Sequence, residues 1–251
     1  MGTVDEFAAA LLRTSCGGDV DAVMPKLNTH GAAIVDDIVA GTVLDSACAL
    51  LLPSLEAIAY RLEENDERLS DYDLDDLGLV RAPSVGDGKT NVHFSDETEE
   101  YEALEALAEG GRFASVASTY LGGGTASLFD CGASITRAGG EGMAWHRDGA
   151  EGEVTVLMSL EDVSAQQGCV GVIPGSHTSA SLAKGSETRE DDDVDEEAEA
   201  EAEWFAYRAG KPLFIDARTL HMAKDNAADE GRCILWSIFQ RENDDDDGSE
   251  G

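Results

Sequence analysis

The sequence predicts a mainly β fold of the jelly-roll or sandwich type, with α-helices packed on its outside. Short apolar runs separated by Gly, Pro, Asn or Asp follow one another through residues 111–241, which is typical of many strands joined by turns. Residues 1–110 instead carry apolar side chains at helical spacing. With 251 residues and 42% hydrophobic content, the chain can bury a sizeable core, and we expect one domain over residues 1–251.

The helices are expected early in the chain. Residues 4–14 and 40–64 place apolar side chains on one helical face, and Pro53 is expected to kink or break the second helix. Residues 65–98 are polar, acidic and rich in Asp, Gly and Ser, so we expect a long loop that borders the mouth of a site. A further helix is expected near residues 98–109.

The strands are predicted from runs of β-branched and aromatic residues that turn residues bound on both sides. Because these runs are short and closely spaced, they favour two packed sheets over one open sheet. The predicted strands are Ala126–Ile135, Val154–Leu160, Val170–Ile173, Leu213–Ile215 and Cys233–Phe239.

Charge is the second unusual property of the chain. The formal net charge of −35 repels phosphate backbones, so we expect no nucleic-acid partner. Residues 187–203 contain eleven acidic residues and one basic residue, and we expect a disordered, solvated insertion there. A docking site for cationic partners or Ca²⁺ is the alternative, and adaptation to a salty cytoplasm stays open. Residues 242–251 form a second acidic segment, a tail.

Cysteine usage and the chain start indicate a cytoplasmic protein. The five cysteines are odd in number and widely separated, and they lack zinc-finger spacing, so we expect reduced thiols. Met1–Arg13 lacks the basic start and cleavage site of a secretory signal. No apolar stretch was expected to reach the length of a membrane span, so we expect no membrane partner. The oligomeric state stays open.

The run Trp145-His146-Arg147-Asp148-Gly149, together with the distant His221, is the strongest candidate for a site. Two imidazoles and one carboxylate form the facial triad that holds non-haem Fe(II), with three coordination positions left open. The His-x-Asp tripeptide alone is a weak signal, because a surface histidine often has an acid two residues away. The residues around it therefore decide the interpretation.

Those surroundings match an ordered pattern. Gln167-Gly168-Cys169 precedes Pro174-Gly175-Ser176-His177, and Gly210-Lys211-Pro212 opens the apolar approach to His221. Over roughly residues 25–241, the chain resembles the phytanoyl-CoA dioxygenase-like family of Fe(II)/2-oxoglutarate-dependent oxygenases. The opening strand of that family resembles the segment His30–Asp37. Lys211 stands where the family usually has Asp, a departure in a turn that touches no proposed ligand.

The resemblance implies a double-stranded β-helix, which is a cupin-like jelly roll, in a single catalytic domain with the metal at its mouth. It implies Fe(II), O₂ and 2-oxoglutarate as co-substrate, and hydroxylation of a small molecule with release of succinate and CO₂. Asn226 has two interpretations, because it can also hold a turn. The implied metal ligands are His146, Asp148 and His221, and the implied co-substrate contacts are Arg232, Thr155 and Asn226.

Other motifs are expected to lie outside the site. The family uses the histidine at His177 structurally, and neither His30 nor His93 is paired with a carboxylate at ligand spacing. Gly86–Thr90 imitates part of a phosphate-binding loop without its first glycine, and Gly122–Gly124 lacks dinucleotide-binding spacing. We expect both glycine runs to be turns.

Two alternatives from other classes stay open. One is a non-catalytic module that binds a metal or a small acid, and the other is a cupin-type metalloenzyme that does not use 2-oxoglutarate. The intact triad together with Arg232 argues against the binding module. Arg232 and the Pro174–His177 segment argue against the cupin-type enzyme. The substrate is not predicted, although an acidic rim would favour a cationic or zwitterionic molecule over an acyl-CoA. In halogenases related to the resembled family, a small residue replaces the carboxylate ligand of the iron. The presence of Asp148 at that position therefore favours hydroxylation.

Overall fold

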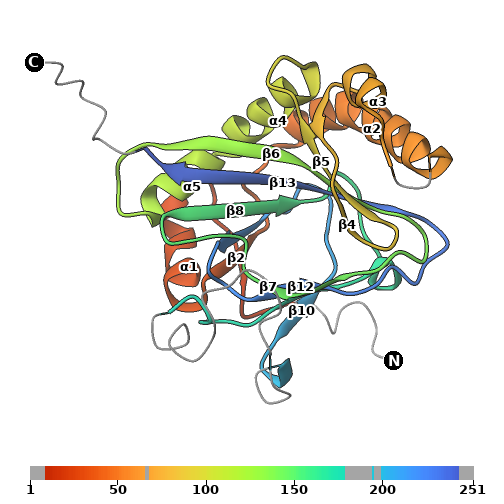
Figure 1. Cartoon of the computed structure of the whole chain (residues 1–251). Helices are drawn as coiled ribbons and strands as arrows, with labels where there is room; N and C mark the ends of the chain where they lie inside the picture. The colour runs from red at the N-terminus through yellow and green to blue at the C-terminus, as the bar shows by residue number, and fades with distance from the viewer. Residues whose placement is uncertain (1–8, 66–67, 179–193, 195–198, 243–251) are drawn as a thin grey trace, which may run out of the picture.

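A computed structural model describes residues 9–65, 68–178, 194 and 199–242. Two sheets face each other, and the helices lie on the outer side of the larger one (Figure 1). The larger sheet has the strand order β1-β2-β11-β8-β13-β6-β5-β3, with β4 paired to β5, and the smaller sheet has the order β10-β9-β12-β7. The predicted jelly-roll arrangement is confirmed.

The larger sheet is built from strands that come from both halves of the chain. Antiparallel pairing dominates, and β1 with β2 is a parallel pair. The predicted runs near 126, 154, 213 and 233 each form one of its strands. Its strands are β1 Arg13–Thr14, β2 Ala32–Val35, β3 Leu79–Arg81, β4 Ser84–Gly86, β5 Lys89–Phe94, β6 Ala126–Thr136, β8 Glu153–Met158, β11 Leu213–Asp216 and β13 Arg232–Arg241.

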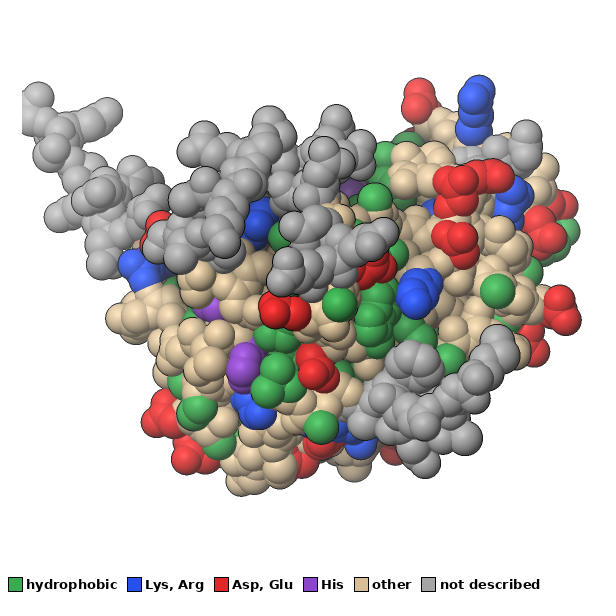
Figure 2. Space-filling model, turned by 90° about the horizontal axis from the view of Figure 1, so that it is seen from below, with side chains coloured by type: hydrophobic (Ala, Val, Ile, Leu, Met, Phe, Trp, Pro, Cys, Tyr) green, Lys and Arg blue, Asp and Glu red, His purple; other side chains and the backbone are tan. Residues whose placement is uncertain are grey.

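The smaller sheet lies below the larger one in Figure 1 and carries shorter strands. Figure 2 views the molecule from that side, where hydrophobic side chains gather near the middle and acidic side chains lie both beside them and toward the margins. An apolar cluster that includes Ile34, Val172 and Ile215 fills the space between the two sheets. The strands of the smaller sheet are β7 Met143–His146, β9 Val170–Val172, β10 Glu203–Phe205 and β12 His221–Ala223.

The helices cover the other face of the larger sheet. A second apolar cluster joins Leu51, Leu55 and Ile58 of α2 to Val156 and Phe214 of the sheet, so the core is a helix-on-sheet layer. The helical segments are η2 Val20–Val23, α1 Met24–His30, α2 Gly41–Glu64, α3 Asp71–Asp76, α4 Glu99–Gly110, α5 Phe113–Tyr120 and η3 Ala165–Gln167.

Helix α2 continues through Pro53, so the expected break is wrong. Proline removes one backbone hydrogen bond, which frees the carbonyl four residues earlier at Ala49. Both Pro53 and Ala49 are exposed, so water can satisfy that carbonyl. By length and composition alone, with a mean hydropathy of 1.5 in its most apolar window, α2 also reaches the size of a membrane span, contrary to expectation.

Two further expectations about the first half need correction. Residues 4–8 of the expected 4–14 helix lie outside the described part, and Arg13–Thr14 forms β1. The expected loop over 65–98 is wrong, because it contains α3, β3, β4 and β5. The sequence of β5 looks polar because Lys89, Asn91 and His93 face a cavity between the sheets rather than the apolar core. The predicted helix near 98–109 is confirmed as α4.

The acidic insertion expected over 187–203 lies mostly outside the described residues. Its last residue, Glu203, begins β10. Of the acidic tail over 242–251, the structure describes residue 242 alone.

Candidate metal centre

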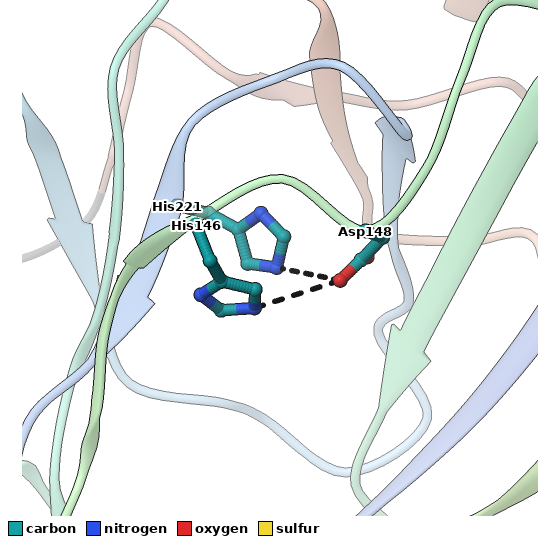
Figure 3. Close-up of side chains that lie close together, drawn as sticks. All are labelled: His146, Asp148 and His221. Atoms are coloured by element: carbon teal, nitrogen blue, oxygen red, sulfur yellow. Dashed lines mark ion pairs between the residues drawn. The ribbon is translucent and has the colours of Figure 1, made fainter. Parts of the chain in front are cut away.

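The two predicted histidine ligands lie opposite each other in the smaller sheet. His146 ends β7 and His221 begins β12, and the two residues are register partners in the antiparallel pair. Asp148 follows β7 by two residues, and its carboxylate turns back toward both rings (Figure 3). Its Oδ1 lies 3.5 Å from Nε2 of His146 and 3.4 Å from Nε2 of His221. Folding therefore brings together the three ligands that the sequence predicted.

Backbone carbonyls fix the orientation of both imidazoles. Nδ1 of His146 lies 2.8 Å from the carbonyl oxygen of Ala144, and Nδ1 of His221 lies 3.0 Å from that of Thr219. Because a carbonyl only accepts, each Nδ1 carries the hydrogen and each Nε2 keeps its lone pair. Backbone bonds of this kind orient histidines in metal sites.

The resulting geometry fits a bound cation. Two Nε2 lone pairs and one carboxylate oxygen converge, and the ligand atoms of His146, Asp148 and His221 all lie within 4.8 Å of one another. Acceptors that face each other without a donor repel unless a proton or metal lies between them. In addition, Oδ2 of Asp148 is buried and has no hydrogen-bond partner within the described residues. Two imidazoles and one carboxylate suit a divalent first-row metal with open positions for other ligands.

The electrostatics of the triad also favour positive charge at its centre. Burial alone raises the pKa of Asp148, but the charge of a protonated His221, and the hydrogen bonds that both rings donate when protonated, hold it well below its usual range. Burial alone lowers the pKa of His221, but the Asp148 carboxylate raises it above its usual value. A carboxylate that stays ionised while buried can hold either a proton or a metal ion on these nitrogens.

The Pro174–His177 segment positions the triad without contributing a ligand. The hydroxyl of Ser176 accepts a hydrogen bond of 2.8 Å from the backbone N–H of Leu220, next to His221. The Arg147 guanidinium donates to the carbonyls of Ser176 and Arg218, so the same turn holds the His-x-Asp segment. His177 is buried against Gly31, in agreement with its expected structural role.

The triad lines a cavity of about 340 Å³ between the sheets. Arg232 and Thr155, both expected to contact the co-substrate, line it as well. The hydroxyl of Thr155 is buried without a hydrogen-bond partner in the described residues. Asn226 does not line this cavity. Its amide donates to the carbonyls of Arg137 and Glu230 at 2.9 and 2.8 Å, so the structure places Asn226 in the turn between β12 and β13.

Arg232 is a buried cation held by backbone oxygens. Its Nη1 donates to the carbonyls of Gln167 and Gly168 at 2.6 and 2.7 Å, and its Nη2 donates to that of Lys224 at 3.1 Å. Burial lowers its pKa. Gly168, with φ of 102°, makes the contact possible, because a Cβ there would collide with Nη1. In the described part of the chain, no acidic side chain forms an ion pair with Arg232.

Lys89 is a site residue that the sequence analysis missed. It begins β5, lines the same cavity and is 4% exposed. Lys89 and Arg232 both register with Thr136 of β6, so two cations lie one strand apart on either side of it. Burial, and then the charge of Arg232, lower the pKa of Lys89 to about 8, although the charge of Asp148 partly opposes them. The alternation of Lys89, Asn91 and His93 with Thr90, Val92 and Phe94, which are β-branched or aromatic, was the available signal.

His93 was expected outside the site, and the group of possible metal ligands among the described residues does not include it. It lines the cavity with Arg81, Phe129, Asp130 and Trp236. Its ring lies 3.1 Å from the Asp130 carboxylate, a pairing across strands that spacing along the chain does not reveal. The glycines of Gly86–Thr90 form the turn between β4 and β5, as expected.

Solved structures similar to this one include non-haem enzymes. The epimerase SnoN, in complex with Fe³⁺, α-ketoglutarate and nogalamycin RO, is 19% identical at a TM-score of 0.61, over 90% of this chain and 84% of that one. AviO1 from Streptomyces viridochromogenes Tue57 is 18% identical at 0.61, over 88% and 95%. The carbocyclase SnoK is 16% identical at 0.59, over 87% and 82%. These likenesses show a shared fold.

Sequence comparison identifies the family. No curated protein sequence matches the chain. The family model for phytanoyl-CoA dioxygenase matches residues 27–234, which include the triad, Lys89 and Arg232. The chain belongs to the phytanoyl-CoA dioxygenase (PhyH) family.

Proposed function

We propose that this protein is an Fe(II)- and 2-oxoglutarate-dependent dioxygenase that hydroxylates a small molecule and releases succinate and CO₂. The observation that carries the proposal is a pair of buried cations, Lys89 and Arg232, in the cavity of the His₂Asp triad. Neither has an acidic ion-pair partner among the described residues. Buried charges are costly unless they are paired, so this cavity favours an anionic ligand.

A 2-oxo diacid fits both features of the cavity. The planar guanidinium of Arg232 suits a carboxylate in two-point contact, and the compact ammonium of Lys89 adds a second positive charge beside it. The other end of such a molecule carries the carboxylate and keto oxygens that the open positions of a facial triad accept. The unpartnered hydroxyl of Thr155 supplies a further hydrogen-bonding group in the same cavity.

In this proposal His146, Asp148 and His221 hold the iron, and Lys89 and Arg232 hold the co-substrate. Bound iron would supply the redox chemistry that couples O₂ and 2-oxoglutarate to oxidation of a substrate C–H bond. The chain orients both reactants and limits access of water to the metal. Asp148 occupies a position that a halide would need to fill, which favours hydroxylation. The similar structures include an epimerase, a carbocyclase and a monooxygenase, so the product has to be tested directly.

The test uses anaerobic protein loaded with Fe(II). Addition of 2-oxoglutarate is expected to give a visible charge-transfer band, which His146→Ala abolishes and Arg232→Met weakens. Ser84→Ala, in the exposed β4 hairpin, is the matched control and should leave the band unchanged. Under O₂, the wild type should release succinate.

The outcomes separate the alternatives. Folded, iron-loaded protein without the band would contradict the use of 2-oxoglutarate and would favour a cupin-type metalloenzyme. A band without succinate release across a broad substrate screen would favour a binding module.

We also propose that the catalytic domain spans the chain and is cytoplasmic. Fractionation of cells that express the tagged protein tests the location.

A further inference from the structure

The cavity has a second set of polar side chains that the iron and co-substrate sites do not use. We call the outer wall the five residues that line the cavity toward the surface. Its charged members are paired, Trp236 is buried, and Phe129 is 64% exposed. The outer wall consists of Arg81, His93, Phe129, Asp130 and Trp236.

Strand register separates the outer wall from the buried cations. Lys89 and His93 lie four residues apart on β5, which places their Cα atoms roughly 13 Å apart. Trp236 lies four residues beyond Arg232 on β13, and it registers with Gly132, which in turn registers with His93. A five-carbon diacid held between the iron and Arg232 therefore leaves the outer wall for another molecule.

The contact with Asp130 fixes the tautomer of His93. Nδ1 lies 3.1 and 3.3 Å from the two carboxylate oxygens, which only accept, and 3.2 Å from Nη2 of Arg81, which only donates. Because two acceptors face Nδ1 and Nη2 has the carboxylate as its own acceptor, we assign the hydrogen to Nδ1. Nη2 of Arg81 lies 3.3 Å from the same carboxylate and donates to it. Nε2 of His93 is then an acceptor, and no described residue donates to it.

A second, independent observation also indicates a ligand. The indole N–H of Trp236 is buried without a hydrogen-bond partner within the described residues, although Trp236 lines the cavity. Its ring packs edge-on against His93, with 4.7 Å between ring centroids. The absence of a side chain at Gly132 makes room for the indole, because a Cβ there would meet the ring. Buried donors of native proteins are normally satisfied, so an orphan donor in a cavity favours a bound acceptor.

We propose that the outer wall binds the molecule to be oxidised through a hydroxyl group, with His93 as acceptor and Trp236 as donor. A hydroxyl is the uncharged group that both donates and accepts at one atom. Arg81 and Asp130 neutralise each other, so the outer wall offers no unpaired charge to an ionic substrate. Phe129 and the cavity-lining Ile238 suit an apolar ring or chain next to the hydroxyl. Asp130 is a positioning residue that acts through His93.

This proposal rests on the proposed function, and its test keeps the two separate. The full chain is loaded with Zn(II), a redox-inert stand-in for iron, and with 2-oxoglutarate, whose binding is followed by NMR. Benzyl alcohol and benzyl methyl ether are then titrated and detected by saturation transfer. The alcohol is expected to bind about three- to tenfold more tightly than the ether, as one net hydrogen bond requires.

Two variants locate that preference. His93→Leu should remove it, and His93→Gln, which keeps an acceptor, should retain most of it. Tyr72→Ala, exposed on α3, is the control for folding. Equal affinity of alcohol and ether, no saturable alcohol binding, or a preference that survives in His93→Leu would each overturn the inference while 2-oxoglutarate stays bound. Loss of 2-oxoglutarate binding in the wild type would instead contradict the proposed function.

Discussion

The two ends of the cavity handle positive charge in opposite ways. At the inner end, which we define as Lys89 and Arg232, the cations are 4% and 7% exposed, and no described acid pairs with them. At the outer wall, Arg81 has a side chain that is 63% exposed and pairs with Asp130, which also binds His93. A buried charge without a partner in the protein is tolerated where a bound ligand supplies the opposite charge. The contrast indicates an anion at the inner end and a neutral group at the outer wall.

Arg232→Met is expected to have the largest effect. Removal of one partner of a buried charged pair costs about 2–5 kcal/mol, so the Kd for 2-oxoglutarate should rise at least about thirtyfold. Arg232→Lys keeps the charge but loses the planar fork of the guanidinium. Its Kd for 2-oxoglutarate should therefore lie between those of the wild type and Arg232→Met. Titration of the charge-transfer band measures the Kd, and melting curves check folding. An unchanged Kd in folded Arg232→Met would contradict an anion site at the inner end.

Gly168→Ala tests the inner end of the cavity by changing the backbone position that holds Arg232. Alanine at φ of 102° costs about 1–2 kcal/mol, and its Cβ would also displace the Arg232 guanidinium. The variant should therefore lose both unfolding free energy and affinity for 2-oxoglutarate. Gly123→Ala is the matched control, because its φ is 86° and no atom lies near the added Cβ. If both variants lose the same stability and neither loses affinity, Gly168 does not support Arg232.

The sequence predicted the triad well and β5 poorly, for one physical reason. His146 and Asp148 are neighbours along the chain, and His221 lies in an ordered motif, so their chemistry is visible in one dimension. β5 was expected to be loop because Lys89, Asn91 and His93 are polar. Strand prediction assumes that polar side chains face water, whereas here they face the cavity between the sheets.

The outer wall could not be predicted at all from spacing. His93 meets Asp130 only because β5 pairs with β6, and that register depends on the folded sheet. Asn226 shows the opposite case, since its place in the sequence between His221 and Arg232 allowed either a turn or a co-substrate contact, and the structure shows the turn. The three hydrogen bonds of the Asn226 side chain all go to backbone groups in and beside the turn.

Lys89→Met is expected to have a smaller effect that depends on pH. Loss of one charge-assisted hydrogen bond of about 1.5 kcal/mol should raise the Kd for 2-oxoglutarate about tenfold at pH 7. In the free wild type the pKa of Lys89 is about 8, and a bound anion favours the protonated form. Wild-type affinity should therefore fall as pH rises above about 8, and Lys89→Met should lack this fall. Binding titrations between pH 7 and 10 measure the difference.

The same substitution should stabilise the free protein. Below pH 8 both the folded and unfolded states hold the Lys89 proton, so the full burial penalty is present. Between pH 8 and 10.5 the unfolded state binds more protons, and wild-type stability should gain from rising pH through this residue. At pH 7 Lys89→Met should raise the unfolding free energy by about 1–3 kcal/mol. A destabilised variant would mean that Lys89 has a compensating partner in the free protein.

Asp130→Asn should have the smallest effect on the affinity for 2-oxoglutarate. It therefore tests whether the outer wall and the inner end of the cavity bind different ligands. The amide cannot neutralise Arg81 or hold the Nδ1 hydrogen of His93 as well, so unfolding free energy should fall by about 1 kcal/mol. The Kd for 2-oxoglutarate should change less than about twofold, because strand register puts Asp130 away from Arg232. The preference for benzyl alcohol over its ether should weaken. If the variant instead loses 2-oxoglutarate as Arg232→Met does, the cavity is one electrostatic unit, and the assignment of separate ligands to its two ends is wrong.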